Sequence, residues 1–228
     1  MSAEASGRSS GRALTGELRR ELVGVERRIR EHRFLEALER AEVPRERLVA
    51  FVAEQQAIIA SDRRSFAMLA ARFPKPPAGE LFLSLAEGEG RALSLLPPLA
   101  AALGAGEAEL AAHQLAPGAQ AYPAYLAWLA LNGARADVSL ALLANLLAWG
   151  ENCARMERAL RASYGLSEEA TAFLRFFAQP PPDSRQLLEA VLDDGLAAGD
   201  SPEHARRAAR LLQAYELMFW DALAEGLP

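Results

Sequence analysis

The chain has 228 residues, of which 51% are hydrophobic and 24% are charged, and its formal net charge is −5. That is the composition of a globular protein long enough to bury a sizeable core. An acidic chain without a basic block argues against nucleic-acid binding, and a lone cysteine, Cys153, excludes an internal disulfide. No apolar run reaches the ~18 residues of a membrane span. We therefore expect a cytoplasmic protein that binds neither nucleic acid nor membranes.

The first expected element follows a segment of small and polar residues. Residues 1–12, MSAEASGRSSGR, have no apolar core and predict a disordered tail. After them, Leu18, Leu22, Val25 and Ile29 recur at helical spacing and predict a helix over 14–31.

The rest of the chain keeps the same period, and strand signals are almost absent. Proline and glycine breaks separate the further helices, which we expect at 45–72, 79–103, 118–132, 137–163, 167–178, 185–198 and 202–225. The connections are short, as in helical bundles. The sequence therefore predicts one all-α domain over residues 13–228.

Five polar side chains interrupt the apolar stripes of these helices. Glu216 has Leu212 one turn before it and an aromatic pair one turn after it, where a charge is costly unless it is paired. The others are Gln55, Asp62, Tyr122 and Asn145. They are either core groups bonded to a neighbouring helix or a buried water, or the lining of a shared pocket between helices.

Three segments resemble the TenA family, the thiaminase II group with the haem-oxygenase-like fold. They are EHRFLEALERAEVPRERLVAFVAEQQ (31–56), APGAQAYPAYLAWLALNG (116–133) and AYELMFWDAL (214–223). The last is similar to the family's closing Glu-x-x-Phe-Trp-Asp. The related pyrroloquinoline-quinone synthase branch, which shares the fold, is the second choice. The resemblance spans about residues 14–226 and implies a haem-oxygenase-like helical bundle and a role in thiamin metabolism.

The resemblance also implies a pocket. Glu216 matches the family's closing glutamate, which binds an aminopyrimidine ring and shuttles protons, and Tyr122 matches a pocket tyrosine. We expect Glu216 to act in acid–base chemistry or ring binding. The other expected pocket residues are Gln55, Tyr122, Asn145, Trp149, Phe219 and Trp220.

Two departures put the family's chemistry in doubt. Asn145 stands where the family has its thiol nucleophile, and an amide cannot form the covalent adduct. Gln55 stands where the family has an aspartate. Cys153 lies eight residues beyond Asn145, about 12 Å along the helix, and is no obvious substitute.

The sequence leaves three functions open. The leading hypothesis is a TenA-like protein that binds, and in one version transforms, a thiamin-related aminopyrimidine or another small aromatic heterocycle. If it is an enzyme, it is a hydrolase of the thiaminase II type with divergent activity. The alternative is a non-catalytic protein that binds a ligand or a partner on the same scaffold. A haem or di-iron oxidase is remote, because the three histidines, His32, His113 and His204, form no Glu-x-x-His pair. We expect no cofactor, no metal, and a homodimer or homotetramer.

Overall fold

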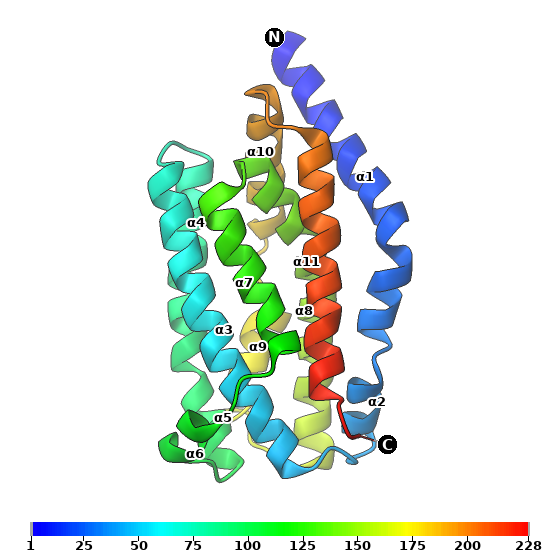
Figure 1. The fold of residues 1–228 in the computed structure, drawn as a ribbon, viewed down its shortest axis with the longest axis vertical. Helices are drawn as coiled ribbons and strands as arrows, with labels where there is room; N and C mark the ends of the chain where they lie inside the picture. The colour runs from blue at the N-terminus through cyan, green and yellow to red at the C-terminus, as the bar shows by residue number, and fades with distance from the viewer. Residues whose placement is uncertain (1, 228) are drawn as a thin grey trace.

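The long apolar periods of the sequence form long helices in the computed structural model, which describes residues 2–227 and, from residue 11 onward, their side chains (Figure 1). The helices are α1 (Ser2–Arg30), α2 (Arg33–Glu39), α3 (Arg45–Arg72), α4 (Ala78–Ser94), α5 (Leu96–Ala102), α6 (Glu107–Ala112), α7 (Pro117–Asn132), α8 (Arg135–Ser163), α9 (Ala172–Ala178), α10 (Ser184–Ala197) and α11 (Pro202–Leu223). The described residues contain no strand, so the predicted all-α class is confirmed.

The structure differs from the expected helices in several places. The helix predicted over 167–178 begins only at Ala172, as α9. The helix predicted over 79–103 divides at Leu95 into α4 and α5, because Pro97 and Pro98 have no amide hydrogen to continue the helical ladder. The short helices α2 and α6 were not predicted, since one or two turns carry too little periodicity. In the structure α1 begins at Ser2, within the segment 1–12 that the sequence predicts as a disordered tail. The side chains of residues 2–10 lie outside the described part, and the tail stays a prediction.

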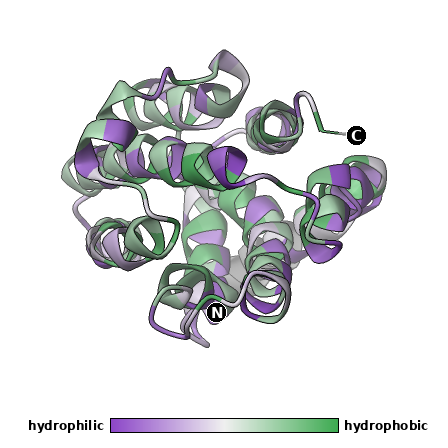
Figure 2. Ribbon diagram, turned by 90° about the horizontal axis from the view of Figure 1, so that it is seen from below, coloured by the Kyte–Doolittle hydropathy of each residue, from purple (hydrophilic) through white to green (hydrophobic). Residues whose placement is uncertain are grey.

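The helices form an elongated bundle in which α3 and α4 lie side by side and α11 packs against α7 and α8 (Figure 1). The outer flank beside α11 is formed by α1. Viewed from one end, the helices carry both hydrophilic and hydrophobic residues around their axes, as amphipathic helices do (Figure 2). Across the described residues, no helix has both the length and the apolar character needed to cross a bilayer.

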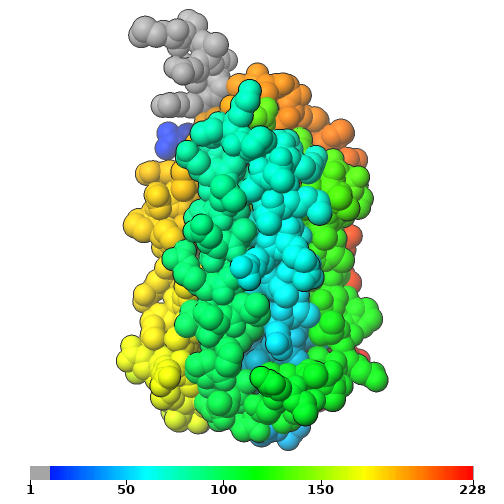
Figure 3. Space-filling model, turned by 90° about the vertical axis from the view of Figure 1, so that its left-hand side faces the viewer, coloured from blue at the N-terminus to red at the C-terminus, as the bar shows by residue number. Residues whose placement is uncertain are grey.

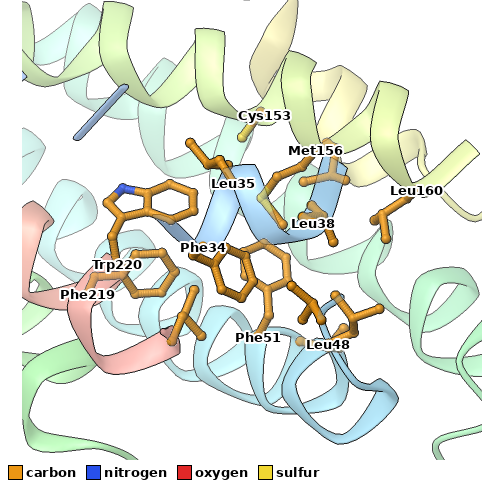
Figure 4. Close-up of a cluster of buried hydrophobic side chains, with 14 of the residues drawn as sticks. Phe34, Leu35, Leu38, Leu48, Phe51, Cys153, Met156, Leu160, Phe219 and Trp220 are labelled. Atoms are coloured by element: carbon orange, nitrogen blue, oxygen red, sulfur yellow. The ribbon is translucent and has the colours of Figure 1, made fainter. Parts of the chain in front are cut away.

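Two clusters of buried apolar residues make up the core. One of them contains Phe34, Phe51, Phe219 and Trp220, and Figure 4 shows these rings gathered between α2, α3 and α11. The other contains Phe66, Leu126, Val138, Leu192 and Leu212, among others. Tyr122 packs against both clusters, so the start of α7 lies where they meet.

A buried carboxylate fastens the start of α7 to α3. Glu54, which is 1% exposed, accepts a hydrogen bond from the Ala116 amide at 2.7 Å and from Gln120 Nε2 at 2.5 Å. Its Oε1 also lies 2.9 Å from Nε2 of His113. Three partners satisfy a carboxylate that would otherwise be costly to bury. This contact fixes the position of Tyr122 relative to α3.

Candidate functional site

A cavity of about 230 Å³ lies inside the bundle, between α3, α4, α8 and α11, with further walls from α7, α9 and the start of α10. Figure 3 shows the face on which α4 lies between α3 and the α9–α10 region. Most of the wall is apolar, as ligand pockets usually are. Its polar members are Gln55, Asp62, Ser84, Glu89, Arg91, Tyr122, Asn145, Asp183, Ser184 and Glu216.

Glu216 lines the cavity from α11, and a hydrogen bond from Trp220 orients its side chain. Its Oε1 accepts a hydrogen bond of 2.9 Å from Trp220 Nε1, one turn later on the same helix, which orients the carboxyl group. Glu216 is only 4% exposed, and burial raises its pKa to about 7, against the opposing effects of the Trp220 N–H and the Asn145 amide. At neutral pH this group can therefore both donate and accept a proton.

Asn145 reaches the same end of the cavity from α8. Its amide is close enough to favour the charged form of Glu216. However, its buried Nδ2 makes no hydrogen bond of ordinary geometry, although the residue is only 7% exposed. A buried donor without a partner costs free energy, which a ligand acceptor would recover.

Aromatic rings form the wall next to this carboxyl–amide pair. Trp149 on α8 and Phe219 on α11 both line the cavity, and their ring centroids are 6.0 Å apart in an edge-to-face arrangement. Phe177 adds a second edge-to-face contact to Trp149, at 5.7 Å. These rings give a flat ligand an apolar surface beside a polar edge.

A second polar region lies on α3 and α4. Asp62 is 5% exposed, and its buried Oδ1 has no hydrogen-bond partner. Burial raises its pKa well above the usual range, and the charges of Glu89 and then Glu216 add to the rise. Glu89 keeps some accessible surface because it faces the cavity, yet protein surrounds it closely enough that burial raises its pKa to about 8.

The structure brings most of the expected pocket residues onto this one wall. They are Gln55, Tyr122, Asn145, Trp149, Phe219 and Glu216. Trp220 requires a correction, because it is fully buried behind Glu216, against Phe34 and His32, and is not on the wall. Its side chain can position Glu216 but cannot contact a ligand in the cavity.

Cys153 is also away from the cavity. It is fully buried near Leu35 and Met156 in the aromatic core cluster, as Figure 4 shows. Burial raises the pKa of its thiol well above the usual value, and the charge of Glu216 adds to the rise. A thiol in this environment stays protonated and is a poor nucleophile.

None of the three histidines lines the cavity. His32 caps the start of α2, where its Nδ1 accepts a hydrogen bond from the Phe34 amide, and its Nε2 lies 3.1 Å from an oxygen of Asp221. His113 binds Glu54, and His204 is exposed near the start of α11. In the described part of the chain, no three His, Cys, Asp or Glu side chains are grouped so that they could hold a metal ion.

Sequence reasoning missed Glu89 as a wall residue. A signal was present, because Glu89 has Leu85 one turn before it and Ala92 one turn after it, both apolar. Ser84 and Asp183 carry no such signal, since a serine in a helix and an aspartate after three prolines are ordinary surface residues. Only the packing of α4 and of the segment before α10 places them on the wall.

Comparison with known proteins identifies the family. The model of the TENA/THI-4/PQQC family matches residues 19–226. The chain belongs to this family. No curated protein is significantly similar to it in sequence.

Solved structures of this TenA-family fold superpose along most of the chain. A TenA homologue from Pseudomonas syringae pv. tomato has a TM-score of 0.80 at 16% identity, over 93% of each chain. A TenA homologue from Pyrococcus furiosus has a TM-score of 0.72 at 20% identity, and the match covers 92% of this chain and 99% of the homologue's chain. A domain of unknown function with a heme oxygenase-like fold, from Shewanella denitrificans, has a TM-score of 0.70 at 12% identity. The match covers 92% of this chain and 91% of that domain. The expected haem-oxygenase-like bundle is thereby confirmed.

Proposed function

We propose that this TenA-family protein binds a small aromatic nitrogen heterocycle, of the aminopyrimidine kind, with its ring edge on Glu216 and its face against Trp149 and Phe219. The observation that carries the proposal is the buried carboxyl group of Glu216, which accepts a hydrogen bond from Trp220 and lines a cavity with aromatic walls. A carboxyl group pairs with a ring nitrogen and an adjacent exocyclic amine through two parallel hydrogen bonds. The unpaired Nδ2 of Asn145 offers a third contact, to a ring nitrogen or a carbonyl.

Binding without covalent chemistry is the function we favour. By resemblance to the family, Asn145 occupies the position of the thiol nucleophile and Gln55 that of a carboxylate. Cys153, the one thiol of the chain, lies in the core away from the cavity. A second candidate is a hydrolase of divergent activity that uses Glu216 for acid–base catalysis, and the pKa of about 7 favours it.

Replacing Glu216 with Gln should weaken binding of aminopyrimidines by about 10- to 100-fold, because the charge-assisted contacts are lost while the shape is kept. Calorimetric titration with 4-aminopyrimidine, thiamin and haem tests this. Glu225→Gln, an exposed change near the end of the chain, is the control and should bind like the unmodified protein. The proposal fails if no aminopyrimidine binds, or if Glu216→Gln binds the aminopyrimidines as tightly as the unmodified protein.

We also propose that the protein assembles as a homodimer or homotetramer. Trp128, which is 50% exposed, and Leu131, which is 61% exposed, lie three residues apart on one face of α7. Trp128 stacks on Tyr125, with ring centroids 5.7 Å apart. Large apolar side chains grouped on a surface are typical of interfaces. Light scattering should give a multiple of the 24.6 kDa chain mass, and a single species of that mass at micromolar concentration contradicts the assembly.

A further inference from the structure

A second pocket lies at the surface, where α1 leads into α2 beside the C-terminal end of α11 (Figure 1). We call it the α1–α2 pocket. Its volume is about 290 Å³, and the side chain of Leu217 forms part of its wall. It shares no lining residue with the cavity that contains Glu216. Its polar lining residues are Arg27, Arg28, Glu31, His32, Arg33 and Asp221.

The three arginines of the α1–α2 pocket have guanidinium N–H groups that no described residue accepts. Arg33 is fixed beyond the end of α11, where its Nη1 donates to the Leu227 carbonyl at 2.9 Å and its Nη2 to the Ala224 carbonyl at 2.8 Å. A guanidinium group has five N–H donors, so about three of them remain on this side chain. Arg27 and Arg28 are exposed in the last turn of α1, and neither takes part in a hydrogen bond or an ion pair with any described residue. The pocket therefore concentrates donors and positive charge that the protein itself does not use.

The two carboxylates of the pocket do not neutralise these arginines. Asp221 lies with its Oδ1 3.1 Å from Nε2 of His32. Glu31 is exposed and forms no ion pair with a described residue. Arginines in the last turn of a helix also interact favourably with the helix dipole, which accounts for the place of the pair on α1. The dipole does not account for their convergence with Arg33, which belongs to another helix.

The geometry of a guanidinium group selects the kind of anion. It matches the oxygens of a phosphate or a carboxylate with two parallel hydrogen bonds. A phosphate group presents oxygens in several directions, so α1 and α2 can contact it at the same time, whereas a carboxylate presents its two oxygens in one plane. Inorganic phosphate also keeps a P–OH group at neutral pH, which can donate a hydrogen bond to the carboxylate of Glu31. Sulfate has no proton to donate there and should bind less tightly.

We propose that the α1–α2 pocket is a phosphate-binding site in which Arg27, Arg28 and Arg33 hold the anion. The ligand is inorganic phosphate or the phosphate group of a small monoester, because both present phosphate oxygens to the three guanidinium groups. The site is separate from the cavity that contains Glu216, so it stands or falls independently of the heterocycle ligand.

Calorimetric titration with phosphate at neutral pH and constant ionic strength tests the site. The unmodified protein should bind inorganic phosphate at least about fivefold more tightly than sulfate. The double variant Arg27→Gln, Arg28→Gln should bind phosphate about tenfold more weakly, since two charge-assisted contacts are lost. Arg19→Gln, Arg20→Gln is the matched control, because it removes the same charge from exposed positions about two turns earlier on α1 and outside the pocket. This control should bind phosphate like the unmodified protein.

The ring of His32 gives an independent measurement by NMR. Burial lowers the pKa of His32, and the neighbouring Asp221 opposes this effect. The charges of Arg33 and Arg28 lower the pKa further. A bound phosphate offsets these two positive charges, so the pKa of His32 should rise when phosphate is added. The ring signals of the two other histidines, which lie outside the pocket, should not move. A His32 ring that does not respond to saturating phosphate contradicts a site at these arginines.

Glycerol 3-phosphate identifies the source of the phosphate group. If it binds at least as tightly as inorganic phosphate, the ligand is a monoester, and if it binds more weakly, the ligand is the free ion. The proposal is overturned if neither compound binds at about 20 mM, or if sulfate binds as tightly as phosphate. It is equally overturned if the two double variants lose the same affinity, because the attraction then depends on net charge alone. Both variants change exposed residues, so a melting temperature within a few degrees of that of the unmodified protein confirms that each is folded.

Discussion

Thiamin incubated with the purified protein should be hydrolysed no faster than in buffer. By the route that the family resemblance implies, cleavage needs a thiolate to attack the pyrimidine and a carboxylate to hold the ring. The resemblance places Asn145 and Gln55 at those positions, and both line the cavity. An amide supplies neither the nucleophile nor the charge. Loss of a covalent nucleophile typically lowers turnover by several orders of magnitude.

Introducing the two groups at the positions that the resemblance implies should raise thiamin hydrolysis. The variant Asn145→Cys, Gln55→Asp places a thiol and a carboxylate on the cavity wall with Glu216, whose pKa of about 7 suits proton transfer. Release of the thiazole product, followed by chromatography, measures the gain. Asn145→Ser, Gln55→Asp is the matched control, because it retains the new carboxylate and replaces the thiol with a hydroxyl group.

Rapid hydrolysis by the unmodified protein would show that the nucleophile is elsewhere. Cys153 is then the first residue to test, since it is the one cysteine of the chain. We expect Cys153→Ser to have no effect on turnover, because the thiol lies in the core and off the cavity wall.

The contribution of Glu216 to the free energy of unfolding of the ligand-free protein should fall as the pH rises from about 4 to about 8. Its pKa is about 7 in the folded protein, against an ordinary value of 4.5. Between these values the folded state binds more protons than the unfolded state, so the stabilisation present below pH 4.5 is lost as the pH passes through 7. The difference corresponds to about 3 kcal/mol. Burial raises the pKa of Asp62 and of Glu89 as well, so both act in the same direction.

Thermal unfolding between pH 5 and pH 8 measures this effect through the variant Glu216→Gln. The variant cannot ionise at this position, so its melting temperature should decline less steeply with pH than that of the unmodified protein. Burial lowers the pKa of His32, which acts in the opposite direction near pH 6, and comparison with the variant removes this contribution. Glu225→Gln is exposed and should follow the unmodified protein. Equal pH slopes for the unmodified protein and Glu216→Gln would show that Glu216 is ionised in the folded state.

The sequence by itself determined the helical class and most of the long helices. The predicted bounds of α3, 45–72, agree with the structure because an apolar stripe along a helix of 28 residues is a strong periodic signal. Ser201 and Pro202 likewise predict the start of α11, where the Ser201 side chain accepts a hydrogen bond from the His204 amide. These features depend on residues a few positions apart, so local sequence is enough to specify them.

Tertiary structure alone decided which polar groups share a cavity. Glu89 reaches the wall because α4 packs beside α3, and no local pattern contains that relation. Trp220 and Phe219 are adjacent in sequence, yet about 100° of helical rotation turns one behind Glu216 and leaves the other on the wall. The helical period identifies a buried stripe, whereas only the packing of helices distant in sequence determines whether that stripe faces the core or a cavity.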